Sequence, residues 1–252
     1  MQDTNELLKF TIPQLLRWRI NETGEKVALR EKDFGYWVNY TWNDYYRRVR
    51  EVALGLEKVG VKKGDKVALI GDNIPELLFM AIGAQSLGAI SAGIYQTTLP
   101  DEIAQLINYM DVTAVFCDDQ EQVDKLVDIR DQIPQVRKVI YEDPRGMRDY
   151  RSDDWYIFIE DLYDMGEAAH AANPEKFDAL IDQGSPDDVC HFCLTSGTTG
   201  LSKGSMITHK NYINMGIQIS KVDKLENTDE YLSFLPFAWI GEQMNSFGVA
   251  MA

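Results

Sequence analysis

The sequence predicts an α/β fold in which parallel or mixed sheets are flanked by helices. Short apolar runs, such as residues 66–70, alternate with helical segments of ten or more residues, which is the pattern of βαβ units. These runs are apolar throughout, as expected for strands that are covered on both faces. The composition is that of an ordinary globular protein, with 45% hydrophobic and 26% charged residues.

The first half of the chain contains the clearest elements. Residues 41–44 have the form of a capping box with Asp44 at the third helical position, and apolar residues then recur at helical spacing as far as Leu56. Pro75 and Pro100 lie where two further helices are expected to begin. A fourth helix is expected over residues 121–130. The strands are expected at residues 66–70, 89–95, 114–117 and 137–141.

The second half is predicted to begin a new unit. Residues 142–184 are acidic and show weak periodicity apart from a short helix near Phe177, so we expect a connecting excursion within a first subdomain of residues 1–184. A second α/β subdomain, residues 185–252, is expected to carry the remaining elements. These are strands at 189–194, 205–208 and 231–235, a helix over 209–225, and an apolar helix at the end of the chain.

Charge and cysteine content narrow the class of protein. The formal net charge of −15 argues against a general nucleic-acid binder, which needs basic patches for phosphates. Three cysteines argue against a disulfide framework and fit a reducing, cytoplasmic location. Cys190 and Cys193 form a C-x-x-C, but on a strand they point to opposite faces and cannot share a metal ion.

The N-terminus and the longest uncharged stretch are the two segments that could indicate secretion or membrane insertion. The first ten residues have neither a basic region nor an apolar core, so they do not form a signal peptide. Residues 77–100 carry no charge, which raises the question of a membrane span. Several glycines and polar residues interrupt the stretch, and its periodicity changes from helical to strand-like. We therefore expect a buried helix followed by a buried strand.

Residues 194–211, LTSGTTGLSKGSMITHKN, form a loop that is rich in Gly, Ser and Thr and contains Lys203. Glycine lets the backbone approach an anion, while hydroxyl and ammonium groups donate to it. The alternative is a flexible turn between two strands. The loop does not fit the P-loop pattern G-x-x-x-x-G-K-[ST], because Lys203 is followed by Gly204.

The stretch 195–204, TSGTTGLSKG, resembles the phosphate-binding signature of the AMP-forming acyl-adenylate synthetases, with Ser202 where proline is usual. Residues 71–103 resemble the first α/β segment of that superfamily, with Gly93 where proline is common. Residues 208–211 and 235–243 are similar to two later segments, and Trp239 occupies the place of a usual histidine. The resemblance runs from about Leu15 onward and is nearest to bacterial long-chain fatty-acyl-CoA synthetases.

The resemblance implies a two-step reaction. A carboxylate attacks the α-phosphorus of ATP to give acyl-AMP and pyrophosphate, and coenzyme A then displaces AMP to form a thioester. Thr195 is implied to help hold Mg²⁺, and Lys203 and Thr198 are implied to act in catalysis by stabilising phosphate charge. The residues implied to contact the phosphates are Ser196, Gly197, Thr198, Thr199, Gly200 and Lys203. Thr195 completes this implied cofactor-binding set.

The resemblance also bears on the acid site and the partners. Trp239 is implied to form a wall of the acyl pocket, although a core aromatic is the alternative. Glu242 is either a supporting residue there or an acid in the first turn of a helix. His170, His191 and His209 are interpreted as structural. The partners implied are a carboxylic acid, ATP and coenzyme A, with peripheral membrane contact and oligomeric state left open.

Full-length members of the superfamily are about twice as long as this chain, so we expect it to be the truncated N-terminal part of an adenylate-forming enzyme that lacks the full active site. Two alternatives remain at this point. One is a non-catalytic nucleotide-binding fragment or scaffold, and the other is the adenylation domain of a peptide synthetase.

Overall fold

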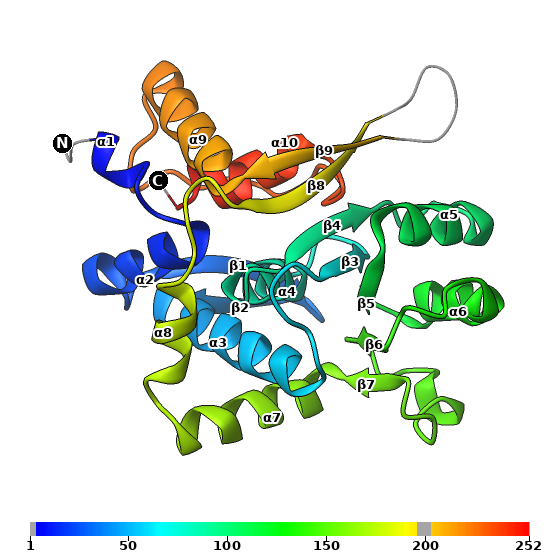
Figure 1. The fold of residues 1–252 in the computed structure, drawn as a ribbon. Coiled ribbons are helices and arrows are strands. Elements are labelled where there is room, and N and C mark those ends of the chain that lie inside the picture. The colour runs from blue at the N-terminus through cyan, green and yellow to red at the C-terminus, as the bar shows by residue number, and fades with distance from the viewer. Residues whose placement is uncertain (1–3, 196–202, 252) are drawn as a thin grey trace.

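The computed structural model describes residues 4–195 and 203–251 and confirms the predicted α/β class (Figure 1). The main sheet has seven strands in the order β7-β6-β5-β3-β4-β8-β9. All neighbouring pairs are parallel except β8 and β9, which are antiparallel. The strands are β3 Lys66–Ile70, β4 Ile90–Ile94, β5 Val112–Cys117, β6 Lys138–Tyr141, β7 Tyr156–Phe158, β8 Val189–Thr195 and β9 Lys203–Thr208.

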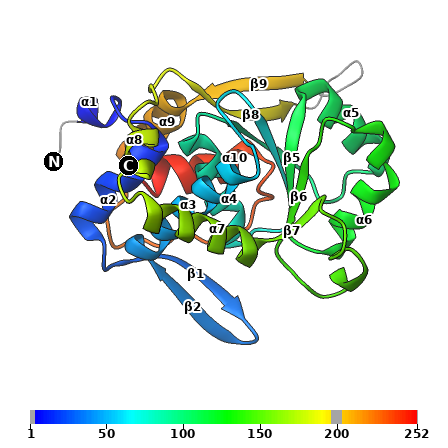
Figure 2. The same cartoon turned by 60° about the horizontal axis from the view of Figure 1, so that its bottom comes forward.

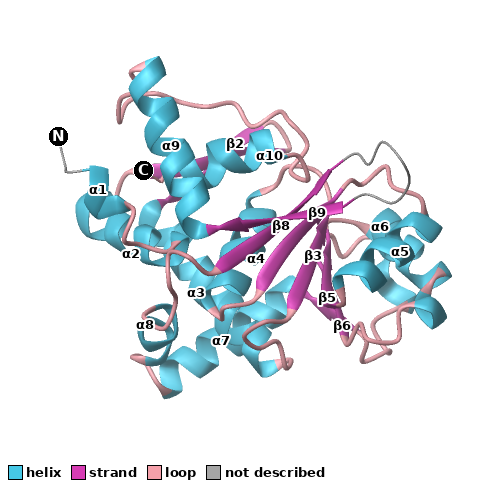
Figure 3. Cartoon of the chain, turned by 45° about the horizontal axis from the view of Figure 1, so that its top comes forward, coloured by secondary structure: helices cyan, strands magenta, loops and turns pink. Residues whose placement is uncertain are grey.

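Helices cover both faces of this sheet (Figures 1 and 3). The longer helices are α2 Ile12–Thr23, α3 Trp42–Lys58, α4 Pro75–Ser86, α5 Pro100–Met110, α6 Gln120–Asp128, α7 Ile159–Ala172 and α9 His209–Asp223. The short ones are α1 Thr4–Leu7, α8 Lys176–Ile181, α10 Ile240–Gln243, the 3₁₀ turns η1 Arg130–Gln132 and η2 Met147–Asp149, and the π-helix η3 Met244–Val249. Two apolar cores result, one containing α2, α3, α4 and α7 and the other containing α5 and α6.

The N-terminal signals in the sequence operate as predicted. The Thr41 side chain accepts a hydrogen bond from the Asp44 backbone, and the Asp44 side chain accepts one from the Thr41 backbone at 3.0 Å, so the capping box of α3 is confirmed. Pro75 and Pro100 begin α4 and α5, where a missing N–H costs nothing. These signals fix the first residues of α3 and of α4 and α5, the two helices that connect β3 to β4 and β4 to β5.

The order of the strands places loops at one edge of the sheet. The chain passes from β3 to β4 on one side and then returns to β5 on the other side of β3. In such sheets ligands bind outside the carboxyl ends of the strands. Because β8 runs parallel to β4, the glycine-rich loop that follows Thr195 leaves the sheet at this same edge.

The structure differs from prediction within residues 142–184. Instead of a connecting excursion, this stretch contributes β7 to the sheet and α7 to its cover. The buried face of α7 includes Gly166 and Ala169, which give a weak hydrophobic signal. Gly166 is required because a side chain there would collide with the backbone of Glu51 in α3.

The prediction of a strand at residues 231–235 is wrong. These residues form no strand, and they pair with neither of the two described sheets. Leu232 and Phe234 are 75% and 69% exposed.

A two-stranded hairpin, β1 Val27–Asp33 and β2 Tyr36–Thr41, was not predicted and projects from the body of the protein (Figure 2). It forms its own antiparallel sheet. Four consecutive charged residues, 30–33, end β1, and β2 contains the polar residues Asn39 and Thr41, so the hairpin lacks the uniform apolar character of the central strands.

The uncharged stretch 77–100 forms most of α4 and then β4, as predicted. Among the described residues, no helix combines the length and apolar character needed to cross a bilayer. The subdomain boundary proposed near residue 184 lies in the turn before β8, and β8 pairs with β4. The division into two subdomains stays a prediction.

Candidate active site at the carboxyl edge

The glycine-rich loop is held at its base by the antiparallel pair β8–β9. Thr195 pairs with Lys203 in the strand register, and the Thr195 hydroxyl donates to the Lys203 carbonyl at 3.1 Å. Both side chains are exposed. The predicted phosphate contacts Ser196, Gly197, Thr198, Thr199 and Gly200 lie outside the described residues. Their roles, and those of Thr195 and Lys203, therefore stay predictions.

Buried hydrogen bonds fix β8 against β4. His191 Nδ1 lies 2.8 Å from Ser91 Oγ, and Gln85 Nε2 donates to the same hydroxyl at 3.2 Å. Burial lowers the pKa of His191 to about 3, so the imidazole is neutral at physiological pH. Burial likewise lowers the pKa of His209 to about 4, and its Nδ1 accepts a hydrogen bond from the Ile12 backbone. These contacts fit the structural interpretation of both histidines, and the contact of His191 with Ser91 positions the strand that leads into the loop.

The segment that follows α9 returns to the same edge. Asn73, just after β3, donates from Nδ2 to Ser233 Oγ at 2.8 Å and to the Leu235 carbonyl at 2.7 Å. A shallow cavity of about 210 Å³ opens beside this contact, lined by Asp72, Asn73, Gln96 and residues 233–236. Asn73 was missed by sequence reasoning, although its place directly after a strand was a usable signal.

The predicted acyl-site motif, residues 235–243, packs against β4. A Cβ atom at Gly93 would lie 2.7 Å from the Cα of Ala238, so only glycine fits there without a shift. Gln243 is fully buried, accepts from the Tyr212 hydroxyl at 2.5 Å and donates to the Phe237 carbonyl at 2.7 Å. The motif is thereby fixed between β4 and α9.

Trp239 and Glu242 have opposite environments within this motif. The Trp239 side chain is 48% exposed, so the alternative of a core aromatic is wrong. Glu242 is 1% exposed, lies in the first turn of α10 and accepts from Tyr231 and Ser246 hydroxyls at 2.9 and 3.0 Å. This position in the first turn is compatible with both interpretations of Glu242. A role for either residue in binding the acid stays a prediction.

Carboxylates gather near this edge, between the sheet and the β1–β2 hairpin. Burial, reinforced by Glu31 and Glu142, raises the pKa of Glu76 to about 7. Burial, with Asp143, Glu31 and Asp118 nearby, raises the pKa of Glu142 to about 7 as well. Within the described part of the chain, no group of three or more His, Cys, Asp or Glu side chains could hold a metal ion.

We expect Glu76→Gln to stabilise the protein at pH 8. The folded state raises the pKa of Glu76 above its ordinary value of 4.5, so it favours the protonated form and loses stability as pH rises towards and through 7. Replacing the carboxylate by an amide should raise the free energy of unfolding at pH 8 by about 1–2 kcal/mol after allowance for solvent screening. Thermal unfolding at pH 8 and pH 4.5 should show this gain at the higher pH only.

Glu102→Gln provides the matched control, because Glu102 also lies in the first turn of a helix that begins with proline but is exposed. Its substitution should give no pH-dependent gain. Equal behaviour of the two variants at pH 8 would contradict the account of Glu76.

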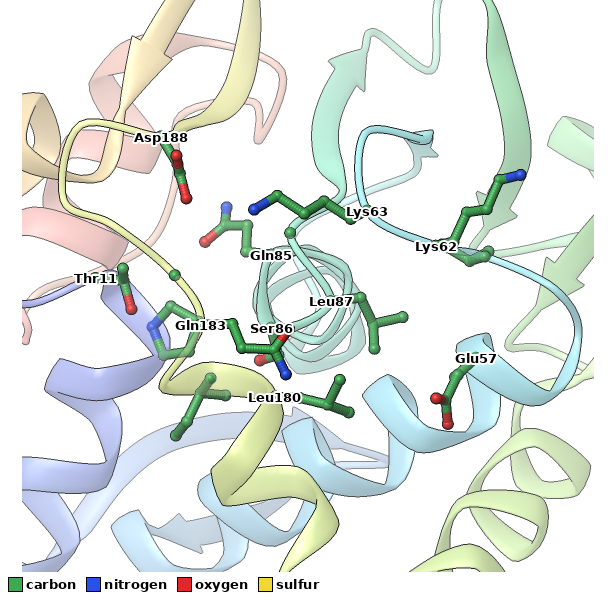
Figure 4. Close-up of a pocket in the computed structure, with 15 residues that line it drawn as sticks. Thr11, Glu57, Lys62, Lys63, Gln85, Ser86, Leu87, Leu180, Gln183 and Asp188 are labelled. Carbon is green, nitrogen blue, oxygen red and sulfur yellow. The ribbon is translucent and has the colours of Figure 1, made fainter.

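A second cavity of about 170 Å³ lies at the opposite, amino edge of the sheet, between the end of α4, α8 and the turn before β8 (Figure 4). Lys63, Gln85, Ser86, Gln183 and Asp188 are among its lining residues. The Gln85 Oε1 atom has no hydrogen-bond partner among the described residues. No predicted site residue lines this cavity, so the candidate site lies at the carboxyl edge.

The α/β sheet and the loop between β8 and β9 place the chain in the class of adenylate-forming enzymes, as their N-terminal part. A family model described as "AMP-binding enzyme" matches residues 16–252, and the chain belongs to that family.

Relatives in this family are named as fatty-acid ligases. The chain is 29% identical to the human long-chain-fatty-acid–CoA ligase ACSBG1, over 94% of this chain and 32% of that protein. It is 30% identical to the rat protein of the same name, over 94% of this chain and 33% of that protein. The chain thus spans about a third of the length of these curated relatives.

Solved structures show the same fold. A putative long-chain-fatty-acid CoA ligase from Rhodopseudomonas palustris CGA009 matches with a TM-score of 0.77 and 20% identity, over 97% of this chain and 56% of that chain. The acetoacetyl-CoA synthetase from Streptomyces lividans matches with a TM-score of 0.78 and 16% identity, over 96% and 37%. At these identities the likeness concerns the fold alone.

Proposed function

We propose that the full-length protein containing this chain activates a fatty acid as acyl-AMP, with release of pyrophosphate, and then forms a thioester with coenzyme A. Membership of the AMP-binding family supports ATP use, and the relatives named as long-chain-fatty-acid–CoA ligases support the acid and the thiol. The observation that carries the proposal is a loop of Gly, Ser and Thr that leaves the carboxyl edge of the sheet between Thr195 and Lys203. A cytoplasmic location belongs to this proposal and fits three free cysteines.

Each loop residue has a defined task in this proposal. Negative charge builds on the phosphate oxygens and on the departing pyrophosphate during acyl-AMP formation. The Lys203 ammonium and the Thr198 hydroxyl stabilise that charge, and backbone N–H groups at Gly197 and Gly200 donate to the phosphates. Because the Thr195 proton is directed to the Lys203 carbonyl, the Thr195 oxygen keeps lone pairs that suit Mg²⁺, which prefers oxygen ligands. Mg²⁺ would balance triphosphate charge there.

ATP–pyrophosphate exchange by the full-length protein, across straight-chain acids from two to eighteen carbons, tests the proposal. We expect exchange that depends on the acid and is strongest with fatty acids. Thioester formation with coenzyme A should follow with the same acids. Nucleotide binding without exchange for any acid would instead identify a non-catalytic nucleotide-binding protein.

A further inference from the structure

The tip of the β1–β2 hairpin carries an aromatic residue in an unfavourable backbone conformation. Asp33 pairs with Tyr36, so Phe34 and Gly35 form a two-residue turn, and both have positive φ, at 42° and 87°. Turns of this kind favour Asn, Asp or Gly, and a bulky residue with positive φ is an outlier. Phe34 is nevertheless 88% exposed and gains no packing in return. The fold therefore does not explain this residue, and a function outside the fold can.

Two more exposed aromatic side chains lie next to the turn, at the start of β2. Tyr36 is 79% exposed and Trp37 is 63% exposed. They are neighbours on β2, so they point to opposite faces of the hairpin, with Trp37 opposite Lys32 and Tyr36 opposite Asp33. The hairpin thus ends in a wedge with aromatic groups on both faces and at its end. Figure 2 shows that the hairpin projects away from the body of the protein.

This arrangement of exposed aromatic residues fits a lipid surface better than a protein partner. A stable protein interface needs roughly 800 Å² on each side, which a narrow tip does not offer. A partner on one face would also leave the aromatic group of the other face in water. A bilayer interface surrounds an inserted wedge on every side, and Trp and Tyr concentrate at that depth in membrane proteins.

We propose that the Phe34–Trp37 tip inserts into the interfacial layer of a zwitterionic phospholipid bilayer. At about 3.3 Å per residue, these side chains lie within roughly 7 Å of the turn along the hairpin, which matches an interfacial insertion of about 5–10 Å. The cross-strand pairing of β1 and β2 satisfies much of the backbone at this depth.

Charge determines which lipid the tip fits. The chain has a formal net charge of −15, so anionic headgroups repel it as a whole. The hairpin adds no positive charge that would offset this, because Arg30 and Lys32 are balanced by Glu31 and Asp33. Insertion is therefore driven by apolar contact, and phosphatidylcholine suits it better than an acidic lipid. The inference goes beyond the proposed ligase activity and does not depend on it.

Co-sedimentation of the full-length protein with phosphatidylcholine vesicles tests the insertion. Phe34→Asn removes the apolar side chain and supplies an Asn-Gly turn, so we expect vesicle partitioning to fall about tenfold, while the melting temperature stays equal or rises. Val222→Asn is the matched control, because Val222 is 79% exposed near the end of α9 and away from the tip. It should leave partitioning unchanged.

Brominated phosphatidylcholine adds a depth measurement. It should quench tryptophan fluorescence in the wild type, and Trp37→Phe should remove most of that quenching. Equal vesicle partitioning of wild type and Phe34→Asn would overturn the proposal, as would partitioning that increases with the fraction of anionic lipid. ATP–pyrophosphate exchange is measured separately, without vesicles. Its result tests the proposed ligase function alone, so the two proposals can fail independently.

Discussion

Lys203→Ala in the full-length protein is expected to lower kcat/KM for ATP by tenfold or more. Charge-assisted contacts of the kind proposed between Lys203 and the phosphates contribute about 1.5–3 kcal/mol, which corresponds to roughly ten- to hundredfold. Lys203 begins β9, and its backbone is held by strand pairing and by the Thr195 hydroxyl rather than by its side chain. Removing the side chain should therefore remove the charge and leave the base of the loop in place.

Steady-state kinetics with varied ATP, alongside melting curves, measure this effect. Lys210→Ala is a matched control: Lys210 is also exposed and lies on the next element, but it pairs with Asp187. It should change kcat/KM for ATP little. Lys203→Arg should restore part of the activity because it keeps the positive charge. ATP kinetics that are unaltered in Lys203→Ala would remove Lys203 from the phosphate site.

Local signals account for the part of the fold that was predictable. The Thr41–Asp44 capping box, Pro75 and the apolar run of β3 each act through neighbours in sequence, and each appears in the structure as expected. The 231–235 strand failed because pairing depends on a neighbouring strand, which a local pattern does not reveal. Helix α7 was not predicted because small residues on its buried face weaken the hydrophobic pattern in the sequence. These small residues allow close packing against α3.

The candidate site, like the fold, was predictable only where its residues are neighbours in sequence. The loop was recognisable because its residues are contiguous and their order is specific. The contacts that hold the surrounding segments join distant residues, as Asn73 does with Leu235 and Tyr212 with Gln243. Gly93 shows why such contacts resist prediction. Its lack of a side chain has a reason only once Ala238 is seen against it.

Trp239→Ala is expected to shift the acid preference of the full-length enzyme towards longer chains. If the indole forms a wall of the acyl pocket, its removal frees space for methylene groups, and each one buried is worth about 0.8 kcal/mol, or about fourfold. Over four carbons the shift becomes more than a hundredfold if each group is buried equally. KM for ATP should change little, because Trp239 belongs to the 235–243 motif and not to the β8–β9 loop.

Because Trp239 is half-exposed, an effect of its substitution on acid preference can be separated from an effect on stability. Truncating a buried Trp costs about 3–5 kcal/mol of stability, whereas a side chain that is 48% exposed should cost clearly less. Trp37→Ala is the control, since Trp37 is a 63% exposed tryptophan on β2, outside the 235–243 motif and both cavities, and should leave the chain-length profile unchanged. The measurement is kcat/KM over a series of straight-chain acids, with melting curves for each variant. A profile that keeps its shape in a stable Trp239→Ala enzyme would place the indole outside the acyl pocket, because a stable fold excludes general damage as the cause.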